Sequence, residues 1–166
     1  MKKSHRPLII ALSVVAVVLI GLIIFSITQI KEFTVTGQSM SPTLISGQKI
    51  ETTKLTSAIK RYNVVVIKEK NSDIFSRVIG LPGDRVVIKS GAVIIYNKSN
   101  PKGFNPDIGQ SYFKRSERTL GKVSQTLSSN QYYVLGDNRS NASDSRNFGP
   151  ISKPSIIAIE LRVESK

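Results

Sequence analysis

The chain has no cysteine and a single histidine, His5, and both shortages limit the chemistry open to it. Without cysteine there is no disulfide framework, no thiolate metal site and no cysteine nucleophile. Because His5 stands near the N-terminus, a Ser-His-Asp triad or a multi-histidine metal centre in the body of the chain is excluded. Acidic residues are also scarce, since 11 Asp and Glu oppose 24 Lys and Arg, a formal net charge of +13 over 166 residues. This length suits one domain of ordinary size.

Apolar residues are concentrated near the N-terminus. Residues 8–25 read LIIALSVVAVVLIGLIIF, without a charge, and the apolar character continues to Ile30. About 20 helical residues cross a hydrocarbon core of roughly 30 Å, so the sequence predicts a transmembrane helix over residues 8–30. A cleavable secretory signal is the alternative. Its apolar region would be shorter, and Ser26-Ile27-Thr28 is a poor small-x-small cleavage site, so a retained anchor is favoured.

The charges around this run predict its orientation. Lys2, Lys3 and Arg6 precede it, and by the positive-inside rule they hold a tail, residues 1–7, in the cytoplasm and send residues 31–166 outside. Without these three residues, 21 basic and 11 acidic side chains remain, a net charge of +10 for the outer region. Such a region can attract anionic lipid headgroups, or it can simply present a solvated basic surface. Nucleic acid is not an expected partner on that side of the membrane.

Short runs rich in β-branched residues recur after the apolar segment, mostly bounded by Gly, Pro, Asn or Asp. They lie at 33–36, 64–67, 85–88, 92–96, 132–135 and 156–159. Lys89-Ser90-Gly91 is typical of a hairpin connection, and 41–46 and 53–60 have room for turns of helix. The predicted fold class is therefore mainly β, a single N-terminal transmembrane helix followed by a mostly antiparallel β-domain. Residues 97–130 are polar and predict a surface excursion.

Three segments are more specific than ordinary turns. Residues 36–44, TGQSMSPTL, place Ser39 where a sharp backbone turn would expose its hydroxyl. Residues 77–85, RVIGLPGDR, hold a Pro-Gly-Asp turn between apolar strands. Residues 136–146, GDNRSNASDSR, offer an ion pair between Asp144 and Arg146 in a loop rich in Asx-type turn formers. Taken singly, each is also compatible with a purely structural turn or loop.

Together, in this order after one N-terminal anchor, the three segments resemble the type I signal peptidase family. The resemblance implies a membrane-bound serine endopeptidase on the outer face of a bacterial plasma membrane, which removes signal peptides from secreted preproteins after small residues. It also implies a Ser–Lys dyad, in which a desolvated, neutral lysine takes the serine proton. No metal or cofactor is implied, and the implied partners are signal peptides or other extended peptides and membrane lipid.

The resemblance assigns roles by position. Ser39 matches the nucleophile, and its backbone N–H would be an oxyanion donor. Gly37 stands where some relatives supply a hydroxyl as a second donor. Met40, Pro42, Thr43 and Leu44 match the segment that shapes the nucleophile turn. The residues that match the second and third segments around the site are Arg77, Gly136, Asp137, Asn138, Arg139, Asp144, Ser145 and Arg146.

Two positions depart from the family pattern. The dyad lysine should directly precede Arg77, but that position is Ser76, which has no group basic enough to act as a general base near neutral pH. The third segment usually carries a small hydroxyl residue that hydrogen-bonds the lysine, and Ala142 stands there. Ser143 is one position away, and a shift would restore the hydroxyl.

Several interpretations stay open. The chain is an active signal peptidase, or a homologue that no longer cleaves and binds extended peptides or assists the assembly of surface proteins. In a third interpretation another base acts on Ser39, and Lys68 and Lys70 are the lysines nearest in sequence to the vacant position. In a fourth, cleavage continues slowly by positioning and oxyanion stabilisation alone. A Ser–Lys self-cleaving regulator that binds DNA would suit the charge, but the anchor argues against it.

Substrate would add as an extended strand beside 33–36 or 73–77, because backbone hydrogen bonds give affinity and shallow apolar pockets select small side chains. Val35, Met40, Ile74 and Phe75 are candidates for the pocket wall, and equally for plain core.

Overall fold

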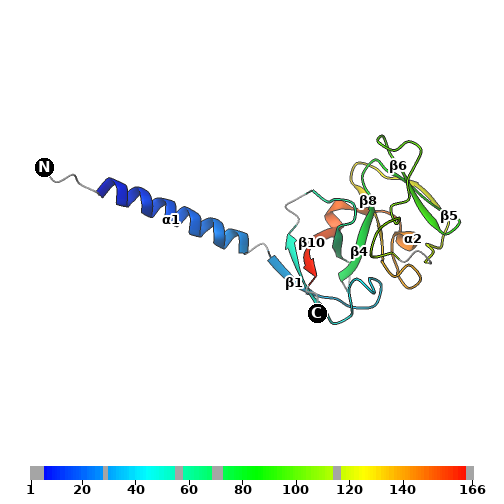
Figure 1. Ribbon diagram of the computed structural model, residues 1–166, viewed down its shortest axis with the longest axis horizontal. Coiled ribbons are helices and arrows are strands. Elements are labelled where there is room, and N and C mark those ends of the chain that lie inside the picture. Colours follow the sequence, from blue (N-terminus) through cyan, green and yellow to red (C-terminus); the bar gives the residue numbers. More distant parts are fainter. Residues whose placement is uncertain (1–5, 28–29, 55–57, 69–72, 114–116, 164–166) are drawn as a thin grey trace.

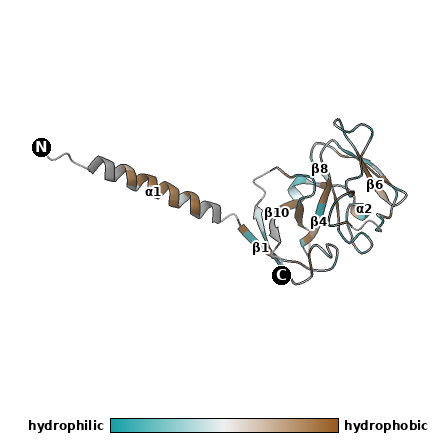
Figure 2. Ribbon diagram, viewed as in Figure 1, coloured by the Kyte–Doolittle hydropathy of each residue, from teal (hydrophilic) through white to brown (hydrophobic). Residues whose placement is uncertain are grey.

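The computed structural model describes residues 6–27, 30–54, 58–68, 73–113 and 117–163. A long helix, α1 (Arg6–Ile27), leads into a domain built almost entirely of antiparallel strands (Figure 1). The apolar side chains from Leu12 to Ile23 are exposed, and the described part of the helix is largely hydrophobic (Figure 2). Within the described residues, no helix reaches the length and hydrophobicity required to cross a membrane. The anchor over residues 8–30 therefore stays a prediction.

Seven strands form the larger sheet, in the order β1-β2-β10-β3-β4-β8-β9, and all their described pairings are antiparallel. Their bounds are β1 (Ile30–Thr34), β2 (Lys49–Lys54), β3 (Val64–Lys68), β4 (Asp73–Gly80), β8 (Gln131–Leu135), β9 (Ile151–Ser152) and β10 (Ile156–Val163). A smaller sheet has the order β6-β5-β7, with β5 (Arg85–Lys89), β6 (Ala92–Tyr96) and β7 (Val123–Thr126). The short helices are α2 (Ser145–Phe148) and the 3-10 helix η1 (Lys153–Ser155). The predicted mainly β, mostly antiparallel domain is confirmed.

The strand predictions differ from the structure in identifiable places. Five of the six runs coincide with strands, whereas the run at 33–36 overlaps β1 only at Phe33 and Thr34. Strands β2, β4 and β7 did not stand out as apolar runs, since each carries several polar side chains. The predicted hairpin is present, because Ser90 and Gly91 join β5 to β6 with φ values of 55° and 82°.

Three groups of buried apolar side chains hold the domain together. One covers the face of the larger sheet that carries Val64, Val66 and Phe75, and it includes Met40 and Leu44 from the segment after β1. A second covers the opposite face, around Val65, Val78 and Val134, and the third lies between β8 and the smaller sheet. The alternation along each strand sends successive side chains to opposite faces.

Candidate active site

Ser39 lies in a folded segment between β1 and β2. The segment enters through Gly37 at φ +79°, a conformation that glycine adopts without strain. Ser41 N donates to the Gln38 carbonyl at 3.1 Å, and Leu44 N donates to the Met40 carbonyl at 2.9 Å. Met40 and Leu44 are fully buried, whereas Ser39 is partly exposed. Burial of these two apolar side chains thus fixes the turn that presents Ser39.

The third sequence segment holds the Ser39 turn directly. Asn138 N donates to the Ser39 carbonyl at 2.9 Å, and Asn138 Nδ2 donates to the Gln38 carbonyl at 3.1 Å. A methyl group added at Gly136 would overlap Cβ of Ala142 and lie 2.6 Å from the Ser39 carbonyl oxygen. Gly136 is therefore the contact point at which Ser39 and Ala142 meet, and only glycine allows so close an approach.

Ser76 joins this group through the strand register. It lies on β4, 1% exposed, opposite Val65 of β3. On the other side of β4, Arg77 pairs with Leu135, and continuing this antiparallel register by one residue places Gly136 beside Ser76. The backbone therefore brings the vacant lysine position, Ala142 and Ser39 around Gly136. A serine and a methyl group occupy the two positions where the family pattern has a base and its hydrogen-bond partner.

Lys68 does not fill the vacancy. It pairs with Asp73 at the end of β3, three residues or about 10 Å along the strand from the partner of Ser76. Its ammonium group is bound to the Asp73 carboxylate at 3.2 Å, and its side chain is 63% exposed. A general base must lie within hydrogen-bond reach of the hydroxyl, so this placement argues against Lys68. Lys70, the other candidate, lies outside the described residues.

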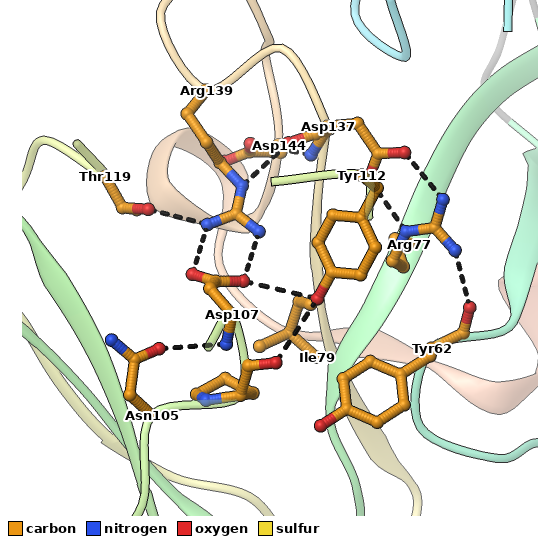
Figure 3. Close-up of polar contacts among 12 residues, drawn as sticks. Tyr62, Arg77, Ile79, Asn105, Asp107, Tyr112, Thr119, Asp137, Arg139 and Asp144 are labelled. Carbon is orange, nitrogen blue, oxygen red and sulfur yellow. Dashed lines mark hydrogen bonds and ion pairs between the residues drawn. The ribbon is translucent and has the colours of Figure 1, made fainter. Parts of the chain in front are cut away.

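Buried Arg–Asp pairs hold the loop after β8, which contacts the Ser39 turn; Figure 3 draws these pairs. Arg77 Nε and Nη2 donate to the Asp137 carboxylate at 2.8 and 2.6 Å, and Arg77 Nη1 donates to the Tyr62 carbonyl at 2.8 Å. Arg139 donates to both Asp107 oxygens at 2.7 Å. Bidentate pairs of this kind are strong and geometrically specific. They fix the loop after β8 to β4 on one side and to residue 107 on the other.

Asp144 and Arg146 form the ion pair that the sequence offered. Arg146 Nε and Nη2 donate to the Asp144 carboxylate at 2.8 Å each, and Asp144 also caps α2 by accepting from Arg146 N. Its Oδ2 accepts from Gly136 N at 3.0 Å, which links the cap to the contact point beside Ser39. The buried hydroxyl of Ser145 accepts from Val134 N at 2.9 Å. Each of these residues braces the loop that carries Gly136 and Ala142.

The segment 97–130 takes part in this site, where the sequence predicted a surface excursion. Asp107, Tyr112 and Thr119 are buried. Thr119 Oγ1 accepts from Arg139 at 2.6 Å, and the Arg77 guanidinium lies 4.2 Å from the centre of the Tyr112 ring (Figure 3). These partners were not predicted, because a polar segment gives no local sign of which buried arginine its acid will neutralise.

The proposed pocket-wall residues lie in the core. Val35, Met40 and Phe75 belong to one buried cluster, at 2%, 1% and 2% exposure. Ile74 packs against the cluster on the opposite face of the sheet. The plain-core alternative is therefore the better description of these four side chains.

The first half of β4 has a free edge. Asp73 to Ser76 pair with β3 on one side, whereas the β8 register begins only at Arg77. No described strand pairs with the other edge of residues 73–75, which makes this edge a candidate place for an added strand. Strand β1 is the second edge, at the end of the larger sheet.

One further acidic group lies near Arg77. Burial raises the pKa of the Glu160 carboxyl, the Arg77 charge lowers it, and the Asp137 charge raises it. The Glu160 Oε1 atom is buried and has no hydrogen-bond partner among the described residues. Over all the described residues, no three His, Cys, Asp or Glu side chains come close enough together to hold a metal ion.

Comparison with known proteins identifies the family to which this chain is related. Residues 8–162 match the family described as "Signal peptidase, peptidase S26". The chain is 32% identical to signal peptidase I U of Bacillus subtilis over 171 residues, which cover 98% of this chain and 90% of that protein. It is 31% identical to signal peptidase IB of Staphylococcus aureus over 170 residues, 95% of this chain and 87% of that protein. A crystal structure of a signal peptidase I from Enterococcus faecalis aligns with 62% of this chain and 97% of its own, at 21% identity and a TM-score of 0.49.

Proposed function

Because this chain belongs to the signal peptidase family, peptidase S26, we propose that it binds signal-peptide segments of secreted preproteins and has lost their efficient cleavage. One observation carries the proposal. Ser39 keeps a supported turn, while the two positions meeting it at Gly136 hold Ser76 and Ala142 in place of a lysine and a hydroxyl residue. A positioned general base contributes about 10²–10⁴-fold to such reactions, and this chain lacks it at that position.

Peptide binding survives these losses because it depends on the backbone. Among the described residues, no strand pairs with the edge of residues 73–75 that faces away from β3, next to Ser76. An extended peptide adding there gains main-chain hydrogen bonds whatever the side chain at residue 76. The bound segment would pass the position at which Ser39 and Gly136 meet.

The proposal includes a membrane anchor and an outer location for the β-domain. Its support is the uncharged run at residues 8–25 and the basic residues Lys2, Lys3 and Arg6 before it. A net charge of +10 on residues 31–166 would favour contact with anionic headgroups at the bacterial plasma membrane. Substrates carrying a signal peptide reach the same surface.

The test restores the missing dyad in the full-length chain, purified in detergent, with a preprotein as substrate. Ser76→Lys combined with Ala142→Ser supplies the base and its hydrogen-bond partner. Because residue 76 is buried, the new lysine is desolvated and its neutral form is favoured. We expect the double variant to cleave at least about 100-fold faster than the natural chain.

Two controls make the outcome specific. Ser39→Ala should abolish the cleavage gained by the double variant, and Ser99→Lys, which adds the same charge at an exposed loop position, should leave the rate of the natural chain unchanged. Equal cleavage by the natural chain and the double variant, abolished in both by Ser39→Ala, would show that another group already acts as the base.

Slow hydrolysis by Ser39 is the second candidate function, and the supported turn at Ser39 favours it. Oxyanion stabilisation and positioning alone leave a residual 10³–10⁴-fold acceleration over water in dismantled serine-protease sites. In the same assay this function predicts a low rate in the natural chain that Ser39→Ala removes. A non-catalytic binding protein predicts no difference between the natural chain and Ser39→Ala.

A further inference from the structure

A cavity of about 480 Å³ lies between the Ser39 segment and the segment 97–130. Pro42 and Thr43 line it on one side, Ser111 and Tyr112 on the other, and Glu160 of β10 contributes an acidic wall. Pro42 stands three residues after Ser39, so the cavity is at most about 11 Å along the chain from the nucleophile. The signal peptidase pattern assigns no role to Glu160, and the proposed function does not use it.

One oxygen of the Glu160 carboxyl is left without a partner among the residues that the structure describes. Its Oε1 atom is buried without a hydrogen-bond partner, and among the described residues no basic side chain forms an ion pair with it. A buried acceptor left unpaired destabilises a protein by about 1–3 kcal/mol, and native structures rarely keep one without a reason such as an unseen ligand or ion.

The Arg77 charge, which acts on Glu160, is already paired with another carboxylate. Arg77 lines the same cavity, but Asp137 holds its guanidinium in a bidentate pair, and the Tyr112 ring covers it at 4.2 Å. Arg77 and Asp137 offset each other, so Glu160 leaves the cavity with one excess negative charge. The surrounding outer region carries a net +10, and this acidic hollow is therefore a local exception on a basic domain.

We propose that this cavity binds the ammonium group of a lysine side chain in the peptide held beside Ser39. An ammonium group offers three compact donors, and the cavity presents the Glu160 carboxylate together with the hydroxyl-bearing side chains of Thr43 and Ser111 as acceptors. The Tyr112 ring provides an apolar wall for the alkyl stem of the lysine. The inference rests on the proposed peptide-binding function and adds a preference for a basic residue to it.

The first test uses a small probe and needs no peptide. The full-length protein in detergent is titrated with n-butylammonium, with n-butanol as the uncharged control, and binding is followed by NMR shifts of labelled tyrosine and glutamate. We expect binding of the ammonium and not of the alcohol, weakened about tenfold by Glu160→Gln. Glu160→Asp, which keeps the charge, should retain most of it, and Glu51→Gln, at an exposed position on β2, should change nothing. Binding unaffected by Glu160→Gln, or no binding at all, overturns the proposal.

The second test separates this inference from the function on which it rests. Two fluorescent signal-type peptides, identical except for lysine or norleucine at one position, are scanned through the positions flanking the cleavage site. At one position the lysine peptide should bind about tenfold more tightly, and Glu160→Gln should remove the difference. Binding of both peptides without a lysine preference at any position overturns the lysine site and leaves the function standing. Butylammonium binding without binding of either peptide overturns the peptide-binding function and the proposed lysine ligand together.

Discussion

Glu160 affects stability as well as recognition, because its protonation state depends on the fold. Burial is the main cause of its raised pKa, opposed by the Arg77 charge and reinforced by the Asp137 charge. Between the ordinary glutamate pKa and the raised one, the folded protein binds more protons at this site than the unfolded chain. By linkage, this group stabilises the folded protein at low pH, and that contribution is lost as the pH rises through the raised pKa.

Glu160→Gln should therefore stabilise the protein in a pH-dependent way. Glutamine resembles the protonated acid in shape, so the free energy of unfolding should equal that of the natural chain near pH 4. Near pH 7.5 the free energy of unfolding of the variant should exceed that of the natural chain by about 1 kcal/mol. This is the low end of the range for an unpaired buried group, and it is chosen because part of the side chain reaches solvent. Urea unfolding of the full-length chain in detergent at several pH values measures the difference. The explanation fails if the difference is the same at all pH values or if Glu51→Gln reproduces it.

At the scale of the elements, the segment 97–130 supports the contact between Gly136 and Ser39 through one ion pair. Asp107 and Arg139 have side chains that are 2% and 0% exposed, and Arg139 Nε donates to the Gly136 carbonyl at 2.9 Å. Gly136 in turn contacts Ser39. A segment remote in sequence therefore fixes the loop on which the Ser39 turn rests.

Asp107→Asn tests this support, because it leaves the buried Arg139 cation without its partner carboxylate. Loss of one partner of a buried pair destabilises by about 3–5 kcal/mol, so we expect a decrease of that size in the free energy of unfolding measured with urea. Lys68→Gln is the matched control, since it breaks the exposed ion pair with Asp73. Loss of an exposed pair should lower the free energy of unfolding by less than about 1 kcal/mol. Similar effects of the two substitutions would mean that the Asp107 pair is no more important than a surface contact.

The elements differ in how far the sequence predicts them. Runs such as 64–67 and 132–135 are apolar and β-branched, and their burial on both faces of the sheet explains why they are recognisable. Strand β2 reads KIETTK and is short of apolar residues, because only Ile50 and Thr52 among its described side chains are buried. Strand β7, with the sequence VSQT, forms by pairing with β5, which no local pattern reports.

The site was predictable in its residues but not in its long-range contacts. The three segments indicate which residues gather near Ser39, and the structure adds that Gly136 is where they meet. The partner of Arg139 is 32 residues away, and a charge on a polar segment gives no sign of which arginine it will meet. The environment of Glu160 was equally unpredictable from the sequence, since its burial and lack of a partner depend on neighbours from other elements.

For the whole molecule, the proposed function requires the β-domain and the first residues of the chain to lie on opposite sides of the membrane. Net charge is distributed accordingly, with three basic residues before the apolar run and +10 on residues 31–166. The absence of cysteine makes this arrangement directly testable, because any single cysteine introduced is the only thiol in the chain.

Ser4→Cys and Ser99→Cys place one thiol before the apolar run and one in an exposed loop after β6. With a membrane-impermeant maleimide on intact bacterial cells stripped of any outer barrier, we expect labelling of the residue 99 variant. The residue 4 variant should be labelled only after the cells are lysed, because the basic residues beside it hold that end inside. The natural chain, which has no thiol, gives the background. Equal labelling of both variants in intact cells would rule out opposite sides of the membrane, and labelling of residue 4 alone would reverse the orientation.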